Sequence, residues 1–279
     1  MFYLILSTIF VSVFGMSYKI TSEKGASIVP AYAIGTGCAL LFFLAWKLHN
    51  SPLQFHNTSA LIGLGTGLVL FTAVSTYFSV ISRGARLGVS WAIITLSMVV
   101  PTSFSIFYWQ EVPTISQTAG LIFALAGIAL LAQVKSGGKK LTPVEWLLLF
   151  VAFAGTGMVG TATKLVSTIQ GGNYKLDYLV ALFMGACVAA TVRTWKKHRR
   201  VKPAEKRIGI VIGIALAGGF MFLLLALQHI SGTVAFPLRT CGSILLTITG
   251  GRILWNERVS KKEYWGLFCA LLAIILMNV

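Results

Sequence analysis

Acidic residues are scarce in this sequence, in which seven Asp and Glu stand against 23 Lys and Arg among 279 residues. Charged residues of both signs make up only 11% of the chain, whereas a water-soluble domain carries about a quarter. In their place, 56% of the residues are hydrophobic, and the mean hydropathy is +0.83. So little charge cannot cover the surface of a soluble protein, and it excludes an ordinary water-soluble fold. Most of the chain must be surrounded by lipid.

Cysteine is also sparse, and its arrangement excludes several kinds of chemistry. The four residues Cys38, Cys187, Cys241 and Cys269 each fall inside an apolar block. No two of them have the spacing of a metal-binding or redox pair, and the four histidines form no HExxH motif. We therefore expect no metal, no cofactor and no catalytic residue.

The formal net charge of +16 raises the question of a nucleic-acid partner. The basic residues, however, lie almost entirely between the apolar blocks, where membrane-topology signals are found. We therefore predict a lipid bilayer as partner and no nucleic acid. The densest basic cluster comprises Arg193, Lys196, Lys197, Arg199, Arg200, Lys202, Lys206 and Arg207.

Long apolar blocks dominate what remains. A helix needs about 20 residues to cross the hydrocarbon core of a bilayer, and ten segments come close to this length. No small-residue cleavage site ends the first block, so we interpret it as a membrane helix and not as a signal peptide. The expected fold is an all-α membrane protein of about ten transmembrane helices, with spans at 1–18, 29–46, 60–82, 87–110, 115–134, 144–164, 178–195, 208–230, 233–255 and 264–279.

An internal repeat relates the two halves of the chain. Trp109-Gln110-Glu111 and Trp255-Asn256-Glu257 are 146 positions apart (255 − 109). Chance similarity of apolar segments does not explain a shared Trp, Glu, Gly and Lys pattern. Two five-helix repeats are therefore predicted, Met1–Val134 and Pro143–Val279, and the odd number of helices makes them inverted relative to one another. The same offset relates Gly120 to Gly266, Leu121 to Leu267, Ala124 to Ala270, Leu125 to Leu271 and Ile128 to Ile274, and an offset of 145 relates Gly15 and Lys19 to Gly160 and Lys164.

These motifs resemble the drug/metabolite transporter superfamily in its ten-helix form with two EamA-like domains. The resemblance rests on the Gly-x-x-x-Lys that ends the first helix of each half, and on a Glu that closes the fourth helix nine positions before a Gly. It implies a transporter of a small metabolite, with substrate bound between the repeats and carried by alternating access. Family members carry amino acids, sugar phosphates, nucleotide sugars or bases, so the cargo is not narrowed. Two more residues separate Gly232 from Glu257 than Gly88 from Glu111, so pocket positions in the fourth and ninth helices are not transferred.

The orientation in the membrane is predicted from the distribution of Lys and Arg. Nineteen of the 23 basic residues fall in the loops after odd-numbered helices. Because cytoplasmic loops are enriched in Lys and Arg, both termini are expected outside the cytoplasm, in a multi-pass protein of the cell (inner) membrane. The family resemblance implies the opposite, cytoplasmic termini.

All seven acids lie at expected helix ends or in loops. Proton-coupled carriers commonly place a carboxylate at mid-membrane depth, where burial raises its pKa. The distribution therefore favours facilitated diffusion or exchange over proton antiport. Glu111 and Glu257, which follow Trp residues at interfacial depth, are interpreted as structural or gate-end residues and not as catalytic ones.

Arg239 is the exception to the apolar pattern, because it lies about 9 Å inside the ninth span. An arginine at such a depth costs about 2.5 kcal/mol or more unless it meets water, a partner or an anion. It is interpreted either as a cavity cation that binds a carboxylate or phosphate, or as a side chain that extends to the headgroups. Pro237 and Pro101 either expose backbone carbonyls beside a substrate or form packing kinks.

Further polar and aromatic groups within the spans are candidates for the substrate site: Tyr77, Trp91, Thr95, Gln228 and Ser243. The alternative for each is a hydrogen bond to a neighbouring helix or to its own backbone. Lys19 and Lys164 are interpreted as architectural residues that complete helix ends, with substrate binding as the alternative.

Two other classes of protein remain as alternatives to a metabolite transporter. A channel or structural membrane subunit requires a continuous polar stripe along several helices, and the polar positions are scattered. A membrane-embedded enzyme requires acid, base or metal groups that converge at one depth, and no such set is present. The sequence does not indicate the oligomeric state.

Overall fold

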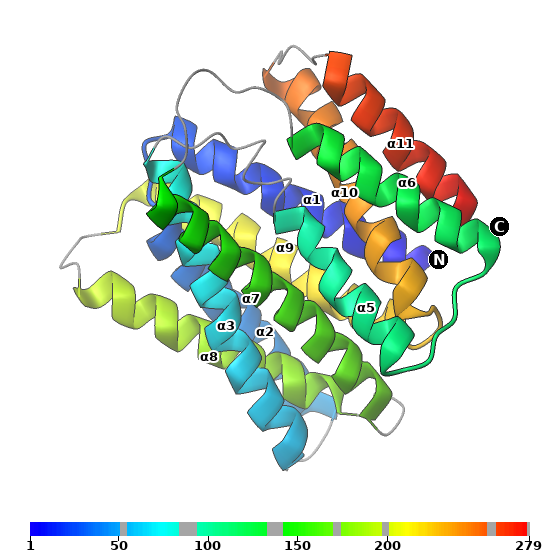
Figure 1. The fold of residues 1–279 in the computed structure, drawn as a ribbon. Coiled ribbons are helices and arrows are strands. Elements are labelled where there is room, and N and C mark those ends of the chain that lie inside the picture. Colours follow the sequence, from blue (N-terminus) through cyan, green and yellow to red (C-terminus); the bar gives the residue numbers. More distant parts are fainter. Residues whose placement is uncertain are drawn as a thin grey trace. The chain divides into compact units, whose positions relative to one another are not determined.

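The computed structural model describes residues 1–50, 55–83, 94–132, 142–169, 174–196, 201–255 and 261–277. Within these ranges the chain forms ten α-helices and a short 3-10 helix, with no strand (Figure 1). The prediction of an all-α fold is confirmed. Part of the predicted span 87–110 lies outside the described residues. The predictions for Trp91 and Glu257 lie wholly outside them.

The helices follow the predicted spans closely. Those of the first sequence half are α1 (Phe2–Glu23), α2 (Ile28–Asn50), α3 (Asn57–Ser82), η1 (Leu96–Met98), α5 (Val99–Phe107) and α6 (Ile115–Ala132). Those of the second half are α7 (Pro143–Thr168), α8 (Lys175–Lys196), α9 (Pro203–Leu227), α10 (Gly232–Trp255) and α11 (Lys261–Met277). Six of them, α1, α2, α3, α7, α8 and α9, are long and apolar enough to cross a membrane.

Several helices extend beyond the predicted spans, because the apolar pattern marks only the segment in lipid. α9 begins at Pro203 instead of residue 208, and its polar first turn is stabilised by Glu205. The Glu205 carboxylate accepts hydrogen bonds from the backbone N–H of Lys202 (2.9 Å) and of Ser27 (2.8 Å). Lys19 likewise does not end its helix, since α1 continues for one more turn.

The described helices group into two compact units that do not coincide with the sequence halves. Unit 1 consists of Met1–Phe71 and Ala162–His229, and unit 2 consists of Thr72–Thr161 and Ile230–Val279. Each unit therefore combines segments of both halves. The division into repeats at Met1–Val134 and Pro143–Val279 stays a prediction about the sequence.

In unit 1, α9 packs against α1 and α2, and α2 also packs against α8. Glycines bring the backbones of α2 and α9 together. A methyl group on Gly209 would lie 2.8 Å from the carbonyl oxygen of Ala31, and one on Gly213 would lie 2.6 Å from that of Gly35. Small residues at helix crossings are the usual means of helix association in lipid, where burying apolar surface gains little.

The same type of contact joins α3 to α8. A methyl group on Gly63 would lie 2.6 Å from the carbonyl oxygen of Tyr178, and one on Gly67 would overlap that of Leu182. Both glycines stand 146 positions before the two glycines of α9, and their contacts on α8 stand 147 positions after the equivalent contacts on α2. Two different helix pairs of unit 1 therefore meet through corresponding residues of the two sequence halves.

In unit 2, α6 and α11 lie side by side and run antiparallel (Figure 1). A methyl group on Gly120 would lie 3.1 Å from the carbonyl oxygen of Ala273, and one on Gly127 would lie 2.9 Å from that of Gly266. Adding 146 to Gly120 and Gly127 gives Gly266 and Ala273. The contact of Gly120 with Ala273 in one half of the pair is therefore matched by the contact of Gly266 with Gly127 in the other.

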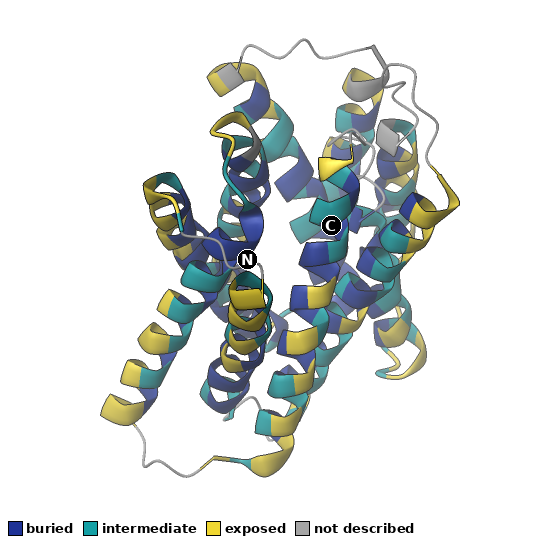
Figure 2. Ribbon diagram, turned by 90° about the vertical axis from the view of Figure 1, so that its left-hand side faces the viewer, coloured by how far each residue is buried: buried dark blue, intermediate teal, exposed yellow. Residues whose placement is uncertain are grey.

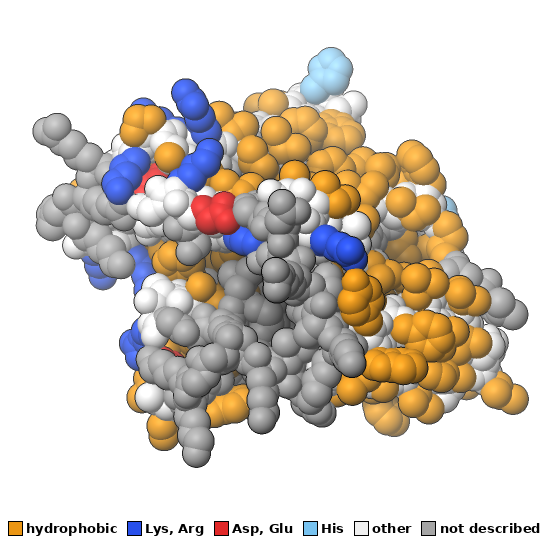
Figure 3. Space-filling view, turned by 90° about the horizontal axis from the view of Figure 1, so that it is seen from above, with side chains coloured by type: hydrophobic (Ala, Val, Ile, Leu, Met, Phe, Trp, Pro, Cys, Tyr) orange, Lys and Arg blue, Asp and Glu red, His pale blue; other side chains and the backbone are white. Residues whose placement is uncertain are grey.

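Apolar side chains remain exposed along the helices, as a lipid environment requires. Figure 2 shows buried and exposed residues alternating along individual helices. Hydrophobic side chains cover a broad area in the view from above, and Lys and Arg gather beside it (Figure 3). Large apolar side chains more than half exposed include Leu41, Leu61, Phe107, Phe150 and Ile253.

Candidate functional site

Arg239 lies in unit 2, seven residues after the first residue of α10 and therefore about 10 Å along the helix. Its side chain is half-buried. Pro237 stands within the same helix and has no backbone N–H to donate to the carbonyl of Thr233. A guanidinium and a backbone carbonyl without its usual helical donor thus occur within two turns of α10.

Pro101 is buried in α5 and lies against Gly160 of α7. A methyl group on Gly160 would be 3.0 Å from Cγ of Pro101 and 3.7 Å from the ring of Phe236. A methyl group on the neighbouring Gly157 would lie 2.7 Å from Cβ of Val100. These contacts support the interpretation of Pro101 as a packing residue, and they place it near the residue that precedes Pro237.

Two hydroxyl groups of α5 were missed by the sequence analysis. Thr102 and Ser105 are 2% and 0% exposed, and neither hydroxyl has a hydrogen-bond partner among the described residues. The two residues are three positions apart and so share one face of the helix. A methyl group on Gly232 of α10 would overlap Oγ of Ser105, so this face is turned toward α10. The spacing of three positions between these hydroxyl residues, directly after Pro101, is a sequence pattern from which they could have been predicted.

Ser243 shows the ordinary alternative for a hydroxyl in lipid. Its Oγ donates a hydrogen bond to the carbonyl oxygen of Thr240 in its own helix, at 2.9 Å. This contact satisfies the Ser243 hydroxyl locally and supports the backbone-bonding interpretation for this residue.

The predicted site residues divide between the two units. Unit 2 contains Arg239, Tyr77, Thr95, Ser243, Pro101, Pro237 and Glu111, and unit 1 contains Gln228, Lys19 and Lys164. Tyr77 is buried in α3, Thr95 is half-buried just before η1, and Gln228 is half-buried at the end of α9. Lys164 is buried one turn before the end of α7.

Glu111 connects α5 to α10 within unit 2. The chain turns after α5 at Gln110, whose φ of 54° lies in the left-handed region. The Glu111 carboxylate then accepts hydrogen bonds from the backbone N–H groups of Gly232 (2.6 Å) and Thr233 (3.3 Å). A carboxylate at a helix N-terminus satisfies free N–H groups and interacts favourably with the helix dipole. This geometry supports the structural role expected for Glu111.

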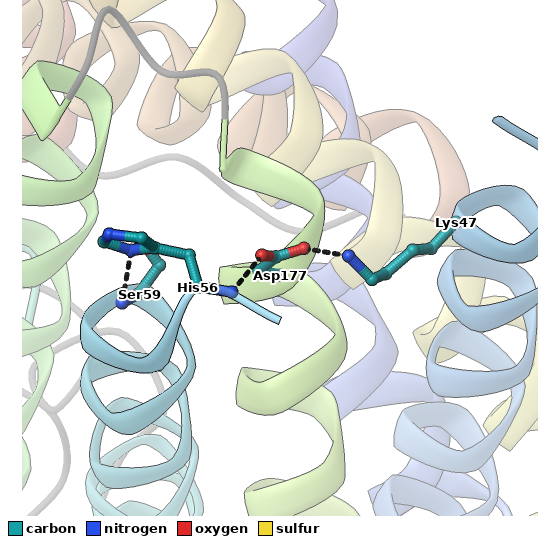
Figure 4. Close-up of polar contacts among 4 residues, drawn as sticks. All are labelled: Lys47, His56, Ser59 and Asp177. Carbon is teal, nitrogen blue, oxygen red and sulfur yellow. Dashed lines mark hydrogen bonds and ion pairs between the residues drawn. The ribbon is translucent and has the colours of Figure 1, made fainter. Parts of the chain in front are cut away.

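A buried carboxylate joins three helices of unit 1 (Figure 4). Asp177 in the first turn of α8 forms an ion pair with Lys47 near the end of α2. Its other oxygen accepts the backbone N–H of His56 at 2.7 Å, just before α3 begins. Nδ1 of His56 lies 3.1 Å from Oγ of Ser59 in the first turn of α3. This cluster could not be predicted from the sequence, because Lys47 and Asp177 are 130 positions apart and give no local signal.

The described acids lie at helix ends, as predicted. Asp177 and Glu205 belong to first turns, and so does Glu145, which accepts the backbone N–H of Thr142 at 2.8 Å. Within the described ranges, no three His, Cys, Asp or Glu side chains come together as metal ligands. The carboxylates that the structure describes in these turns are thus engaged in holding helix starts.

Comparison with known proteins gives distant relatives. No model of a known protein family matches the chain. It is 24% identical over 269 residues to an uncharacterized protein of Haemophilus influenzae, covering 92% of this chain and 90% of that protein. It is 27% identical over 93 residues to the probable 4-amino-4-deoxy-L-arabinose-phosphoundecaprenol flippase subunit ArnE of Proteus mirabilis, covering 33% of this chain and 81% of ArnE.

A further relative is the probable glucose uptake protein GlcU of Priestia megaterium, which is 25% identical over 191 residues. That match covers 66% of this chain and 65% of GlcU, so the chain spans less than two thirds of this relative. A solved crystal structure has the same fold, with a TM-score of 0.80, 15% identity and coverage of 99% of this chain and 94% of the other. The relatives and the six long apolar helices together support an integral multi-pass membrane protein related to small transporters.

Proposed function

We propose that this chain is a transporter of the drug/metabolite superfamily that carries a small metabolite across the membrane by alternating access. Its two EamA-like five-helix repeats, Met1–Val134 and Pro143–Val279, hold the substrate between them, and the protein works as an exporter or exchanger. The observation that carries the proposal is the antiparallel packing of helices that occupy equivalent places in the two repeats.

Three such pairs are α2 with α8, α5 with α10, and α6 with α11. In the first pair, Lys47 near the end of α2 meets Asp177 at the start of α8. In the second, Ser105 near the end of α5 meets the start of α10. A two-fold axis in the membrane plane makes equivalent helices antiparallel, and repeats related in this way open a central site to either side in turn.

The relatives with descriptive names point in the same direction. One is named a flippase subunit and the other a glucose uptake protein, and both names describe movement of a molecule across or within a membrane. Neither name describes an enzyme. This supports transport and a non-enzymatic role, and it leaves the cargo open because the two named molecules differ.

The proposed cargo is anionic or zwitterionic, such as an amino acid. Arg239 is the group that favours it, because a guanidinium binds a carboxylate or phosphate through two parallel hydrogen bonds. The hydroxyls of Thr102 and Ser105, on a neighbouring helix of the same unit, offer further donors. Because the described acids lie at helix ends, we favour exchange or facilitated diffusion over proton antiport.

The test uses the purified full-length protein. A thermal-shift screen with amino acids, organic acids, phosphates and nucleobases identifies cargo, since a ligand that binds the native state raises the unfolding temperature. The compounds that shift it are then measured for uptake into proteoliposomes. Arg239→Met should leave the protein folded and abolish uptake of anionic compounds.

The matched control is Arg252→Met, which removes an exposed arginine from the same helix. Arg252 donates a hydrogen bond to the Tyr264 hydroxyl at 2.8 Å, at the far end of α10 from Arg239. This variant should transport normally. Unchanged uptake by Arg239→Met would remove Arg239 from the mechanism, and absence of uptake of every compound that binds would contradict transport itself.

A further inference from the structure

Tyr32 and Tyr178 lie near the starts of α2 and α8 and are 146 residues apart, one position off the offset of 147 that relates the glycine contacts of these two helices. Both side chains are fully buried in unit 1. Their hydroxyl groups nevertheless differ. The Tyr178 hydroxyl lies 3.0 Å from Oγ1 of Thr163 in α7, whereas the Tyr32 hydroxyl has no hydrogen-bond partner among the described residues.

A buried hydroxyl without a partner is unusual, because most buried polar groups in proteins are hydrogen-bonded. The Tyr178 hydroxyl shows the usual arrangement, with Thr163 as its partner. The Tyr32 hydroxyl, which has none among the described residues, is therefore a candidate to bind a group that the chain does not supply.

The surroundings of Tyr32 are aromatic and basic. Its ring centroid lies 6.2 Å from that of Phe71 in α3, and the guanidinium carbon of Arg193 in α8 lies 6.0 Å from the Phe71 centroid. Two carboxylates of unit 1 lie at the same end as Arg193: Glu23, at the end of α1, and Glu205, which accepts the backbone N–H groups of Ser27 and Lys202. A phenol and a guanidinium both donate hydrogen bonds, so this place suits an oxygen that accepts them.

Tyr32 also lies close to one end of unit 1, which we call the basic end. Here α1 and α8 terminate, and α2 and α9 begin, so the N–H of Ser27 reaches Glu205 and Nζ of Lys202 reaches the carbonyl of Gly25 (3.3 Å). Tyr32 is about 6 Å from the start of α2. Clustered positive charge raises the local concentration of anions. The basic end contains Lys19, Lys24, Arg193, Lys196, Lys202, Lys206 and Arg207.

We propose that the Tyr32 hydroxyl donates a hydrogen bond to a carboxylate or phosphate oxygen of the transported molecule, in a subsite behind the basic end whose positive charge is supplied by Arg193. The inference rests on the transport function proposed above and concerns unit 1 alone, whereas Arg239 belongs to unit 2. Tyr32 is fully buried here, so the ligand reaches it when the basic end opens, as alternating access requires.

The experiment compares Tyr32→Phe with Tyr178→Phe, which each remove one hydroxyl group from a fully buried tyrosine of unit 1. Both variants are purified at full length, and thermal shifts are measured with inorganic phosphate and with L-glutamate, followed by uptake of the compound found by the screen. Tyr32→Phe should leave the ligand-free unfolding temperature unchanged or raised, and weaken binding on the order of tenfold. Tyr178→Phe should lower the ligand-free unfolding temperature, because it loses the bond to Thr163, and should bind like the wild type.

A second variant, Arg193→Met, should weaken binding of the same probe. If Tyr32→Phe binds and transports like the wild type while Arg239→Met does not transport, the subsite at Tyr32 is overturned and the transport function stands. If no compound raises the unfolding temperature of the wild type and none is transported, the proposed transport function itself is contradicted.

Reconstitution in neutral phosphatidylcholine and in vesicles with anionic phosphatidylglycerol distinguishes a phosphate on the transported molecule from one on a lipid headgroup. An effect of Tyr32→Phe confined to anionic vesicles would assign the site to a lipid headgroup and overturn the substrate assignment.

Discussion

Lys47 and Asp177 form an ion pair in which the two side chains are only 4% and 5% exposed. The pair joins the end of α2 to the start of α8 and so fixes the antiparallel arrangement of these equivalent helices. A buried ion pair gains little stability over a well-packed apolar pair, but leaving one charge without its partner is costly. Lys47 also lies 4.4 Å from the ring centroid of Phe55, which leaves little room for water around the ammonium.

Asp177→Asn should destabilise the protein by about 3–5 kcal/mol, because it removes the Asp177 counter-charge from a buried ammonium. Thermal unfolding of the purified protein in detergent measures the effect. The double variant Lys47→Met with Asp177→Asn keeps an oxygen for the His56 N–H and removes the ammonium, so it should recover part of the loss. Equal unfolding temperatures for the single and double variants would contradict the assigned role of the ion pair.

Gly67→Ala should prevent correct packing of α3 on α8, because the new methyl group would overlap a backbone carbonyl oxygen that no rotamer change can move. We expect loss of a monodisperse peak in size-exclusion chromatography after detergent extraction. Gly65→Ala is the control. Gly65 lies in the same helix as Gly67, and a methyl group on it would have no neighbouring atom within 4 Å. This control should be neutral or stabilising by up to about 1 kcal/mol. Normal behaviour of Gly67→Ala would show that the close contact is not required.

The inverted repeat predicts that Trp109 and Trp255 emerge on opposite sides of the membrane. Single cysteines at these positions, in a background without Cys38, Cys187, Cys241 and Cys269, are labelled with a membrane-impermeant maleimide in intact and opened cells. Only one of the two should react in intact cells. A cysteine at Lys24 should react only after opening, since the positive-inside rule places the loops after odd-numbered helices in the cytoplasm. Labelling of both Trp positions from one side would rule out the inverted arrangement.

Much of the fold could be predicted from the sequence, because helix formation in lipid follows from apolar length alone. The first turn of α9 was missed, since Glu205 holds it through partners as distant as Ser27. The offset of 146 found from Trp109 and Trp255 also relates the contacting glycines of both units, because it carries Gly63 and Gly67 onto Gly209 and Gly213, and Gly120 onto Gly266. The helix contacts that these glycines make are visible only in the structure.

The polar contacts could not be predicted in the same way. Whether a hydroxyl forms a hydrogen bond depends on the groups that face it. Ser243 and Ser105 both lie in apolar spans, but the Ser243 hydroxyl bonds to its own helix, whereas that of Ser105 has no partner among the described residues. The Lys47–Asp177 pair depends on the meeting of two helices far apart in the chain. Arg239 was identified because a charge within an apolar span is visible without a fold, and its part in transport stays a prediction. Trp91 and Glu257 remain predictions as well.

The manner in which α9 meets its neighbours determines which helix of unit 1 is able to shift. Against α2, glycine backbone touches backbone, and no torsion angle is left to absorb a displacement. Against α1, the ring of Phe10 covers Gly218, and the Ser7 hydroxyl donates to the carbonyl of Gly219 at 2.8 Å. A phenyl ring and a hydroxyl can rotate and accept new neighbours, so α1 can slide over α9 while α2 stays seated on it. A sliding α1 would carry Tyr18 and Lys19 with it and so change the basic end of unit 1.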